Sequence, residues 1–366
     1  MERTLDSVNA RSRVEWVDIA KGIGIILVII GHLSIPYTDL WIYTFHMPLF
    51  FFLSGVVFSG IKYKFKAFLL KRIKALVIPY FALGFGIFLF FTFLYVYYNK
   101  TGTVPPYFVR GALDTPVNML VKFLVQRGYW TVWFLACLFI AEILFYFVLK
   151  ASKNRMAITV AISSVICVGG LVYYRFGGVT LPWNIDTALI AQFFMCMGYL
   201  FSNSTSLTKF REYITVNASN PVRCIMSVLS LALNVISGFA SLKISGSSVN
   251  MSIGAYGIEP LSFLSAISGI LFIIAVASMI KSRFLSYLGR NTMLVFAWHS
   301  RIVIIALNYL YLAIGIFQSS GFIIRCIYGV VTTIAILAIL MPLDYLIQRS
   351  FLSFMVGRKR IKFKEK

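Results

Sequence analysis

Long apolar segments are the feature that most constrains how this 366-residue chain can fold. A membrane-spanning helix needs about 20 predominantly apolar residues. Hydrophobic residues make up 60% of the sequence and charged residues 13%, so the apolar surface exceeds what a soluble core could bury. The sequence predicts an all-α, polytopic integral membrane protein with about ten transmembrane helices, near residues 16–34, 43–60, 76–98, 128–149, 156–174, 184–201, 221–240, 261–280, 291–315 and 321–347.

The basic residues predict how these helices are oriented. A net charge of +22 would suit a nucleic-acid partner if it lay on one soluble face, but the cations alternate between loops. With the N-terminus placed in the cytoplasm, 25 Lys and Arg residues fall on the inner side and seven on the outer side. This bias predicts that both termini are cytoplasmic and that the number of helices is even. We expect no nucleic-acid partner.

The sequence predicts a single transmembrane domain over residues 1–366, with a short cytoplasmic N-terminus (1–15) and a basic cytoplasmic tail (348–366). The first span carries internal charges and has no cleavage site after it, so we expect it to be retained. The longest stretch outside the membrane, 99–127, is rich in Pro and Gly and is expected to form an irregular outer cap. The five cysteines have no metal-ligand spacing. We expect reduced cysteines that serve as small apolar packing residues, and no metal site.

Three polar residues interrupt the first apolar span: Asp18, Lys21 and His32. Ionisable groups inside a membrane span are costly and usually functional. At 100° per residue, the step from Lys21 to His32 returns to within about 20° of the same helix face, and the two lie roughly 16 Å apart along the axis. The spacing predicts a polar stripe that ends at a histidine.

The other two histidines, His46 and His299, also lie in or at the edge of predicted spans. A neutral imidazole can exchange protons near neutral pH, so each histidine is a candidate acid or base. Acids near the membrane are scarce, and they are Asp18, Glu142, Asp186, Glu259 and Asp344. No phosphate-binding glycine motif is present, and a Ser-His-Asp triad cannot be assembled from the sequence.

Several stretches resemble, in order along the chain, the membrane-bound acyltransferase 3 family, most closely its fucose 4-O-acetylase-like branch. They are RVEWVDIAKGIGIILVIIGH (from Arg13), FHMPLFFFLSGVVF (from Phe45), KRIKALVIPY (from Lys71), WFLACLFIAEI (from Trp133), LPWNIDTALIAQFFMCMGYLF (from Leu181), YGIEPLSFLSAISGI (from Tyr256) and YLGRNTMLVFAWHS (from Tyr287).

The resemblance implies a ten-helix enzyme of the bacterial cytoplasmic membrane. Such enzymes move an acetyl group from cytoplasmic acetyl-CoA to a sugar hydroxyl of a cell-envelope glycan or lipid-linked sugar. Acetyl-CoA would be the donor substrate, and no bound cofactor is expected. The family's helix 1 signature, an arginine and then a histidine eleven positions later, corresponds to Lys21 and His32. Its basic pair corresponds to Lys71 and Lys74, with Arg72 between them.

These assignments suggest a mechanism. The segment 62–74 has six cations and no acid, so it suits the phosphates of CoA. Lys21, just inside the cytoplasmic end of the first span, would hold the diphosphate of CoA. His32 would act as general base on the acceptor hydroxyl, with a covalent acyl-histidine as the less favoured variant. Possible catalytic or substrate-orienting residues are His46, His299 and Asp186, and possible acceptor-binding residues are Trp133, Trp183 and Glu259.

Each assignment has a simpler alternative. Lys21 can snorkel to lipid headgroups while pairing with Asp18, and buried histidines commonly serve helix packing. Tryptophans near a membrane surface are common anchors, and any positive-inside loop is basic. Asp186 can serve only the dipole of its helix. The activity also has alternatives, namely transfer of a succinyl or other acyl group, or transport of a lipid-linked sugar by a flippase. The sequence does not identify the oligomeric state.

Overall fold

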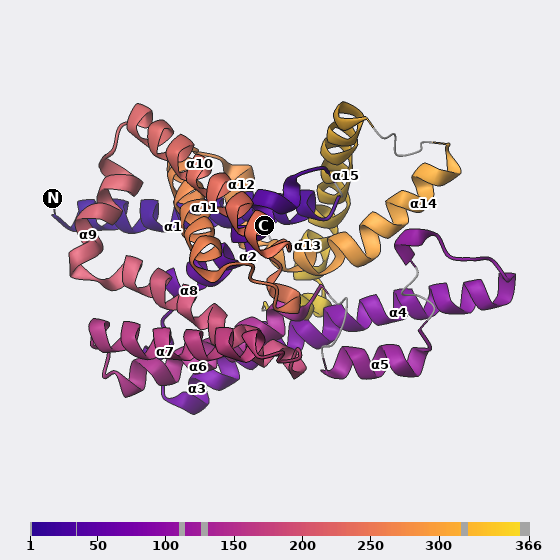
Figure 1. Ribbon diagram of the computed structural model, residues 1–366, viewed down its shortest axis with the longest axis horizontal. Coiled ribbons are helices and arrows are strands. Elements are labelled where there is room, and N and C mark those ends of the chain that lie inside the picture. The colour runs from indigo at the N-terminus through magenta and orange to yellow at the C-terminus, as the bar shows by residue number, and fades with distance from the viewer. Residues whose placement is uncertain (1, 34, 110–113, 126–130, 316–320, 359–366) are drawn as a thin grey trace, which may run out of the picture. The chain divides into compact units, whose positions relative to one another are not determined.

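The computed structural model describes residues 2–33, 35–109, 114–125, 131–315 and 321–358, with side chains for all of these except residues 2–14 and Asp39. Within these ranges the chain forms helices and no β-strand (Figure 1). The helices are α1 (Glu2–Gly31), α2 (Thr38–Val56), α3 (Phe65–Arg72), α4 (Ile78–Thr101), α5 (Pro116–Val125), α6 (Trp133–Ala151), α7 (Met156–Arg175), α8 (Ile185–Asn203), α9 (Thr205–Glu212), α10 (Asn220–Ser245), α11 (Glu259–Met279), α12 (Arg283–Arg290), α13 (Thr292–Trp298), α14 (Ile305–Ala313) and α15 (Phe322–Arg349).

Nine helical segments in the described part of the chain are long and apolar enough to cross a membrane. They begin at Leu40, Phe65, Trp133, Met156, Pro182, Asn220, Glu259, Thr292 and Phe322. Each of them overlaps one of the predicted spans after the first. The prediction of an all-α, polytopic membrane protein is therefore confirmed.

Two segments differ from their predictions. The first predicted span, 16–34, is not among the nine; α1 covers most of it, and the charged residues within the span are Asp18 and Lys21. Its place as a tenth span stays a prediction. The expected irregular cap at 99–127 contains the helix α5, because Pro116 suits a first helical position and the apolar run that follows buries Met119 and Phe123. Residues 110–113 and 126–127 of this cap lie outside the described residues.

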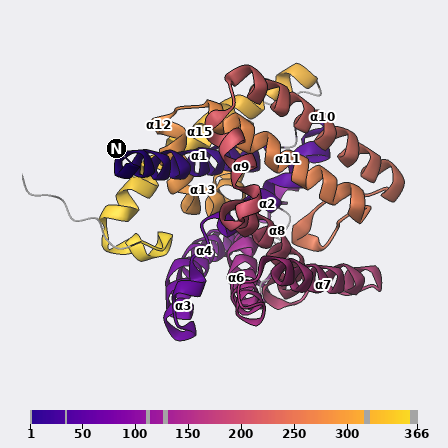
Figure 2. The same ribbon diagram turned by 90° about the vertical axis from the view of Figure 1, so that its left-hand side faces the viewer.

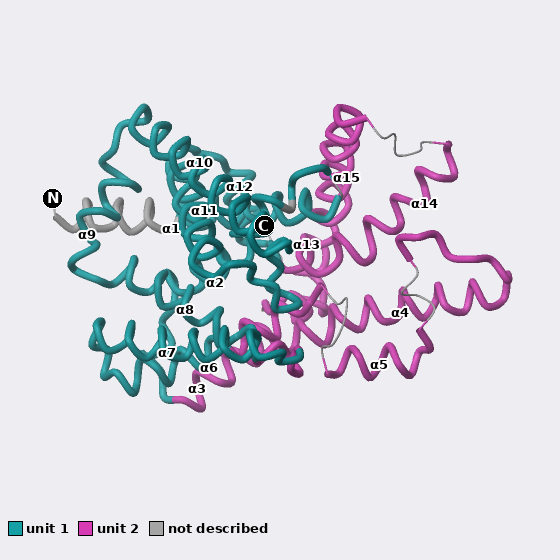
Figure 3. Tube along the Cα trace, in the orientation of Figure 1, with its two compact units in different colours: residues 1–64, 141–179, 186–292 teal, residues 65–140, 180–185, 293–366 magenta. Residues whose placement is uncertain are grey.

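The chain divides into two compact units, which are coloured separately in Figure 3. Unit 1 comprises residues 1–64, 141–179 and 186–292, and unit 2 comprises 65–140, 180–185 and 293–366. In unit 1, α10 and α11 lie side by side (Figures 1 and 2), and both pack against α2. The α2 span is 72% buried, whereas the α10 span is 28% buried and the α7 span 22%. In a membrane, exposed apolar helices such as α7 and α10 face lipid. Helix α2 is mostly buried and is a core helix of unit 1.

Glycines allow the helices of unit 1 to approach at backbone distance. A Cβ added to Gly22 on α1 would collide with the carbonyl of Leu285, and one added to Gly289 on α12 would collide with the carbonyl of Asp18. Gly55 on α2 and Gly198 on α8 approach the opposite backbone in the same way. Small residues at helix contacts are typical of membrane proteins, where close packing drives helix association. The α1–α12 contact fixes the part of α1 that carries Asp18 and Lys21.

A buried polar contact joins three helices of unit 1. The amide of Asn234 on α10 donates to the hydroxyl of Thr44 on α2 over 2.9 Å and to the carbonyl of Ser265 on α11 over 2.7 Å. The Ser265 hydroxyl returns a bond to the carbonyl of Asn234 over 2.9 Å. All three residues are buried. These bonds fix the register of α2, which carries His46 one half-turn after Thr44.

In unit 2, α3 runs through a π-helical turn, Ile73–Val77, into α4. The Tyr80 hydroxyl donates to the carbonyl of Phe123 on α5. Gly84 leaves room for the ring of Phe123, and Gly86 leaves room for Trp298. The Trp298 indole donates to the carbonyl of Leu83 over 3.0 Å. Helix α4 is thereby tied to α5 and to the end of α13.

Candidate active site

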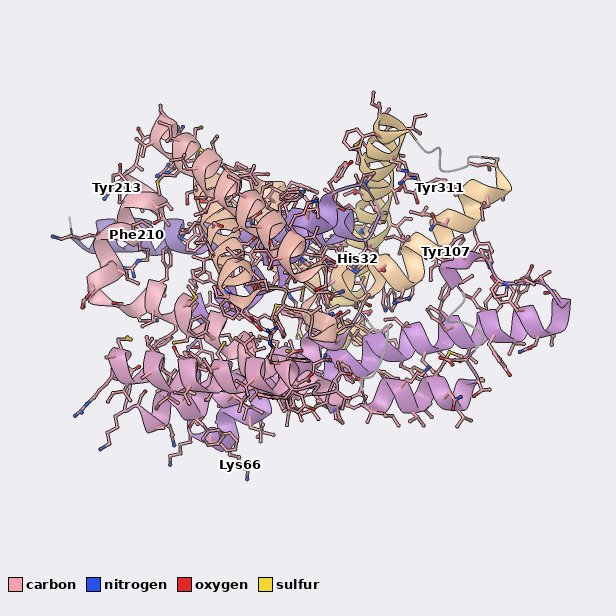
Figure 4. All side chains as sticks on the ribbon, viewed as in Figure 1. His32, Lys66, Tyr107, Phe210, Tyr213 and Tyr311 are labelled. Atoms are coloured by element: carbon pink, nitrogen blue, oxygen red, sulfur yellow. The ribbon has the colours of Figure 1, made fainter. Side chains whose placement is uncertain are left out.

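His32 lies just beyond the end of α1 (Figure 4), where its backbone N–H closes a turn onto the carbonyl of Ile29 over 3.0 Å. Its imidazole Nδ1 is 2.8 Å from the carbonyl oxygen of Val28. A carbonyl can only accept, so Nδ1 carries the proton in the neutral ring and Nε2 holds the lone pair. The side chain is half-buried. This tautomer is the one that lets Nε2 take a proton from a substrate.

His46, on the third turn of α2, repeats this arrangement. Its Nδ1 is 2.8 Å from the carbonyl oxygen of Ile42, and its side chain is 4% exposed. The same reasoning places the lone pair on Nε2. His32 and His46 are also close enough to interact electrostatically. The structure thus brings together two histidines that are separated by 14 positions.

Tyr43 contacts both histidines. Its ring centroid lies 6.2 Å from that of His32 and 5.0 Å from that of His46. Its hydroxyl donates to the carbonyl of Gly31 over 3.1 Å, at the last residue of α1. The sequence reasoning missed Tyr43, although its position three residues before His46 puts both on one helix face. The three side chains form the histidine cluster: His32, Tyr43 and His46.

Lys21 belongs to a second group in unit 1. Asp18, one turn earlier on α1, and Glu142 on α6 are the acids that act electrostatically on its ammonium group. Asp18 is also 3.9 Å from the Nε of Arg290 at the end of α12. Asp18 and Glu142 are 9% and 4% exposed. We name these four residues the charge cluster; it holds two acids and two bases, so its charges balance.

The charge cluster changes the interpretation of Lys21. Two acids already lie near its charge, and a buried charge is tolerated when it is paired. The sequence shows Asp18 and Glu142 as scarce acids but does not pair Glu142 with Lys21 or Arg290 with Asp18. No periodicity reveals this contact, because it joins three helices. A donor phosphate at Lys21 would therefore meet a site that is neutral overall.

Residues 65–74 of the basic segment after α2 lie in unit 2. Lys71 and Arg72 end α3, and Lys74 lies in the π-helical turn Ile73–Val77. Lys71 and Lys74 are exposed, whereas Arg72 is half-buried with its guanidinium 5.7 Å from the ring centroid of Phe68. Single π-helical turns are frequent at functional sites. Both lysines lie where an anionic ligand can reach them.

His299 opens a second π-helical turn of unit 2, His299–Ile304. It is 1% exposed, and its Nδ1 lies 2.9 Å from the carbonyl oxygens of Val295 and Phe296. The hydroxyl of Thr131 donates to the carbonyl of Ala297 over 2.6 Å, immediately before this turn. A side chain that hydrogen-bonds to a backbone carbonyl of a helix is a known cause of an irregular helical turn. His299 belongs to unit 2, whereas the histidine cluster belongs to unit 1.

Asp186 lies in a separate group of unit 1, at the outset of α8. It is fully buried, and its Oδ2 accepts a hydrogen bond from the hydroxyl of Tyr174 on α7. The Tyr174 hydroxyl is also 3.2 Å from that of Thr187, which donates to the carbonyl of Met251 over 3.1 Å. The other carboxylate oxygen, Oδ1, has no hydrogen-bond partner within the described residues. These bonds give Asp186 a structural role between α7, α8 and the segment before α11.

The candidate acceptor-binding residues are scattered. Trp183, in unit 2, donates its indole N–H to the carbonyl of Leu124 over 3.0 Å and packs on the ring of Tyr80 at 5.3 Å. Trp133 begins α6 and is half-buried against Phe134. Glu259 lies in the first turn of α11, in unit 1, and is half-buried. The bond made by Trp183 is that of a structural anchor, and the acceptor-binding roles stay predictions.

Comparisons with known proteins identify the family. Residues 14–341 match the acyltransferase domain Acyl_transf_3. The nodulation protein NolL of Mesorhizobium japonicum is 31% identical over 201 residues, which cover 50% of this chain and 47% of NolL. The chain thus spans about half the length of this curated relative. No solved structure matches. The narrower resemblance to the fucose 4-O-acetylase-like branch stays a prediction. Because the family match covers most of the sequence and all nine spans begin within it, the chain belongs to the acyltransferase 3 family and is a multi-pass membrane protein.

Proposed function

We propose that this protein is an O-acyltransferase that moves an acetyl group from cytoplasmic acetyl-CoA to a sugar hydroxyl of an extracytoplasmic or lipid-linked cell-envelope glycan. The bacterial cytoplasmic membrane is its proposed location. The observation that carries the proposal is the bond from His32 Nδ1 to the Val28 carbonyl, because it sets Nε2 as a proton acceptor. The family match supports acyl transfer as the reaction.

In the proposed reaction, His32 Nε2 removes the proton from the acceptor hydroxyl while the oxygen attacks the thioester carbon. The C–S bond breaks as the new C–O bond forms, and the proton on His32 passes to the CoA sulfur. A positioned base of this kind typically contributes 10²–10⁴-fold to the rate. Tyr43 and His46 orient the acceptor and His32, since the Tyr43 ring contacts both imidazoles. The products are the O-acetyl ester and free CoA.

The proposal is tested by transfer in isolated membranes. Membranes that contain the protein are incubated with acetyl-CoA labelled in the acetyl group and with the glycan fraction of the same cells. We expect label in the glycan that mild alkali releases, because esters hydrolyse under those conditions whereas amides persist. Label that persists after alkali would contradict O-acetyl transfer. Succinyl-CoA in a parallel reaction distinguishes the two acyl groups.

We predict that Lys71 and Lys74 contribute to donor binding. Changing both to alanine should weaken acetyl-CoA binding to the detergent-solubilised protein about tenfold, since two exposed cations are lost. The loss should be larger at low salt than at high salt, because exposed charges are screened. Lys66→Ala, on the same helix, is the matched control. Equal affinity in the double variant and in the control would place the donor elsewhere.

We predict that segment 62–74 faces the cytoplasm and segment 99–127 faces outward. Lys66 and Tyr107 are exposed (Figure 4), so a cysteine at either position should react with a thiol reagent. Cys224 is also exposed and should first be changed to serine. In intact cells, a membrane-impermeant reagent should label Tyr107→Cys and leave Lys66→Cys unlabelled until the membrane is opened. The opposite pattern would overturn the orientation.

A further inference from the structure

The end of the described chain folds back onto the basic segment of unit 2. After α15, a 3₁₀ segment, Phe351–Val356, leads into Gly357. A Cβ added to Gly357 would lie 3.0 Å from the carbonyl oxygen of Ala75, 3.3 Å from its Cα and 3.4 Å from Pro79. Ala75 lies in the π-helical turn Ile73–Val77. Figure 2 shows the yellow C-terminal turn beside the start of α4, where this contact is made.

Glycine is required at position 357 for two reasons. Its φ is +68°, in the left-handed region that glycine adopts at little cost. The backbone contact with Ala75 also leaves little room for a side chain. The close approach therefore determines where the next residue, Arg358, leaves the fold. Arg358 follows Gly357 and Lys74 precedes Ala75 in the sequence. The Cα atom of each cation therefore lies about 3.8 Å from that of a residue in the contact.

Arg358 is held in a defined direction. Its backbone N–H donates to the carbonyl of Ser353 over 3.1 Å, and its Nη1 donates to the Oε1 of Gln348 over 3.2 Å. Gln348 is itself fixed, because its amide donates to the buried carboxylate of Asp344. A guanidinium is planar and presents five donors in a fixed fork. One anchoring bond to Gln348 therefore sets the direction of the whole group, which remains exposed.

The Gly357–Ala75 contact thus brings together, within unit 2, two stretches of backbone that carry cations. Lys71, Arg72 and Lys74 come from the α3–α4 segment, and Arg358 comes from the C-terminus. Segment 62–77 contains no acid. Asp344 interacts electrostatically with Arg358, but it is buried and already bonded to Gln348. The lysines are point charges, whereas an arginine fork matches the oxygens of a phosphate.

We propose that Arg358 binds the 3′-phosphate of acetyl-CoA and that the C-terminal segment Ser350–Arg358 completes the donor site begun by Lys71 and Lys74. This inference rests on the proposed function, because it takes acetyl-CoA as the donor. The ribose 3′-phosphate is a monoester with three terminal oxygens, so it accepts a guanidinium fork well. Arg358 lies outside the matched family residues 14–341. It also follows the last span, which suits a contact with the nucleotide end of the donor.

The test compares acetyl-CoA with its 3′-dephospho form. Binding of each is measured on the full-length protein in nanodiscs of zwitterionic lipid. We expect the wild type to prefer acetyl-CoA, and Arg358→Ala to lose about tenfold or more in affinity for acetyl-CoA alone, as for a hydrogen bond to a charged group. Arg358→Lys should keep part of the preference. Arg349→Ala is the control of equal charge; the Arg349 guanidinium lies 3.5 Å from the ring centroid of Tyr345.

Four results would overturn the inference. The first is an equal loss for both donors in Arg358→Ala, which would indicate a structural role. The second is an unchanged donor preference together with weaker retention of phosphatidylglycerol in nanodiscs that contain this lipid, which would assign Arg358 to a lipid phosphate. The third is a wild type that binds neither donor, which would also contradict the proposed function. Binding of both donors with equal affinity by the wild type would reject the 3′-phosphate contact while leaving the proposed function intact.

Discussion

His32→Ala should reduce acyl transfer by at least a hundredfold while leaving the protein folded and able to bind acetyl-CoA. The activity falls because the proton acceptor Nε2 is lost, and a general base contributes about 10²–10⁴-fold. The fold should persist, because the side chain is half-buried and its bond to the Val28 carbonyl is local, four residues back on α1. The measurement is acetate incorporated into glycan by membranes with matched protein levels.

Two variants accompany this test. His46→Ala should be milder if His46 only orients the acceptor, and comparable to His32→Ala if His46 is the base. Tyr43→Phe removes the hydroxyl bond to the Gly31 carbonyl but keeps the ring between the histidines, so it should reduce transfer by less than tenfold, in line with one ordinary hydrogen bond. Turnover near the wild-type value in His32→Ala would reject the histidine-base mechanism and favour the transport alternative.

The charge cluster gives the second large effect. Glu142→Gln removes one of the two acids that act on Lys21, leaving its charge only partly balanced. Removing one partner from a buried ion pair is strongly destabilising. Because Lys21 is half-buried, we expect the free energy of unfolding to fall by about 3 kcal/mol, the lower end of the range for such pairs. The melting temperature in detergent should fall clearly. Glu142→Gln was chosen because it keeps the size of the side chain.

A double variant separates stability from donor binding. Lys21→Met together with Glu142→Gln removes one base and one acid, so the cluster stays balanced and most of the lost stability should return. If the charge of Lys21 also serves the donor, acetyl transfer should remain low in this stable double variant. Lys21→Arg should be tolerated, since it keeps the charge and adds the phosphate-binding fork. Single and double variants that melt at the same temperature as the wild type would show that the pairing is not structural.

Composition and apolar length were enough to predict the fold class and nine of the spans, because each span is a local property of about 20 residues. They did not predict α5, where proline and glycine suggested an irregular cap. Both π-helical turns in unit 2 were also missed. The turn at His299 follows a carbonyl that is bonded to Thr131, a residue 166 positions away from Ala297. Local sequence carries no record of such a contact.

In the candidate site, too, the residues within one helix could be predicted and those brought together by packing between helices could not. His32 and Lys21 were found because both lie in one helix, where spacing gives the face. Glu142 and Arg290 could not be assigned, since they reach Lys21 and Asp18 only through the packing of α1 against other helices. Helix α12 can approach α1 closely because Gly22 faces the backbone of α12 and Gly289 faces the backbone of α1. The sequence around a glycine does not show which helix will pack against it. Arg358 appeared only as one of many basic residues in the tail.

The most direct measurement is the mass of the envelope glycan from three strains: one with the gene deleted, one complemented with the wild type and one complemented with His32→Ala. The account predicts that the wild type adds the mass of one acetyl group to particular sugars. It also predicts that His32→Ala, present at the same level in the membrane, gives the unmodified mass found in the deletion strain. An acetylated glycan in the His32→Ala strain, or an identical glycan in the deletion and wild-type strains, would contradict the claim that this chain is a histidine-dependent glycan O-acetyltransferase.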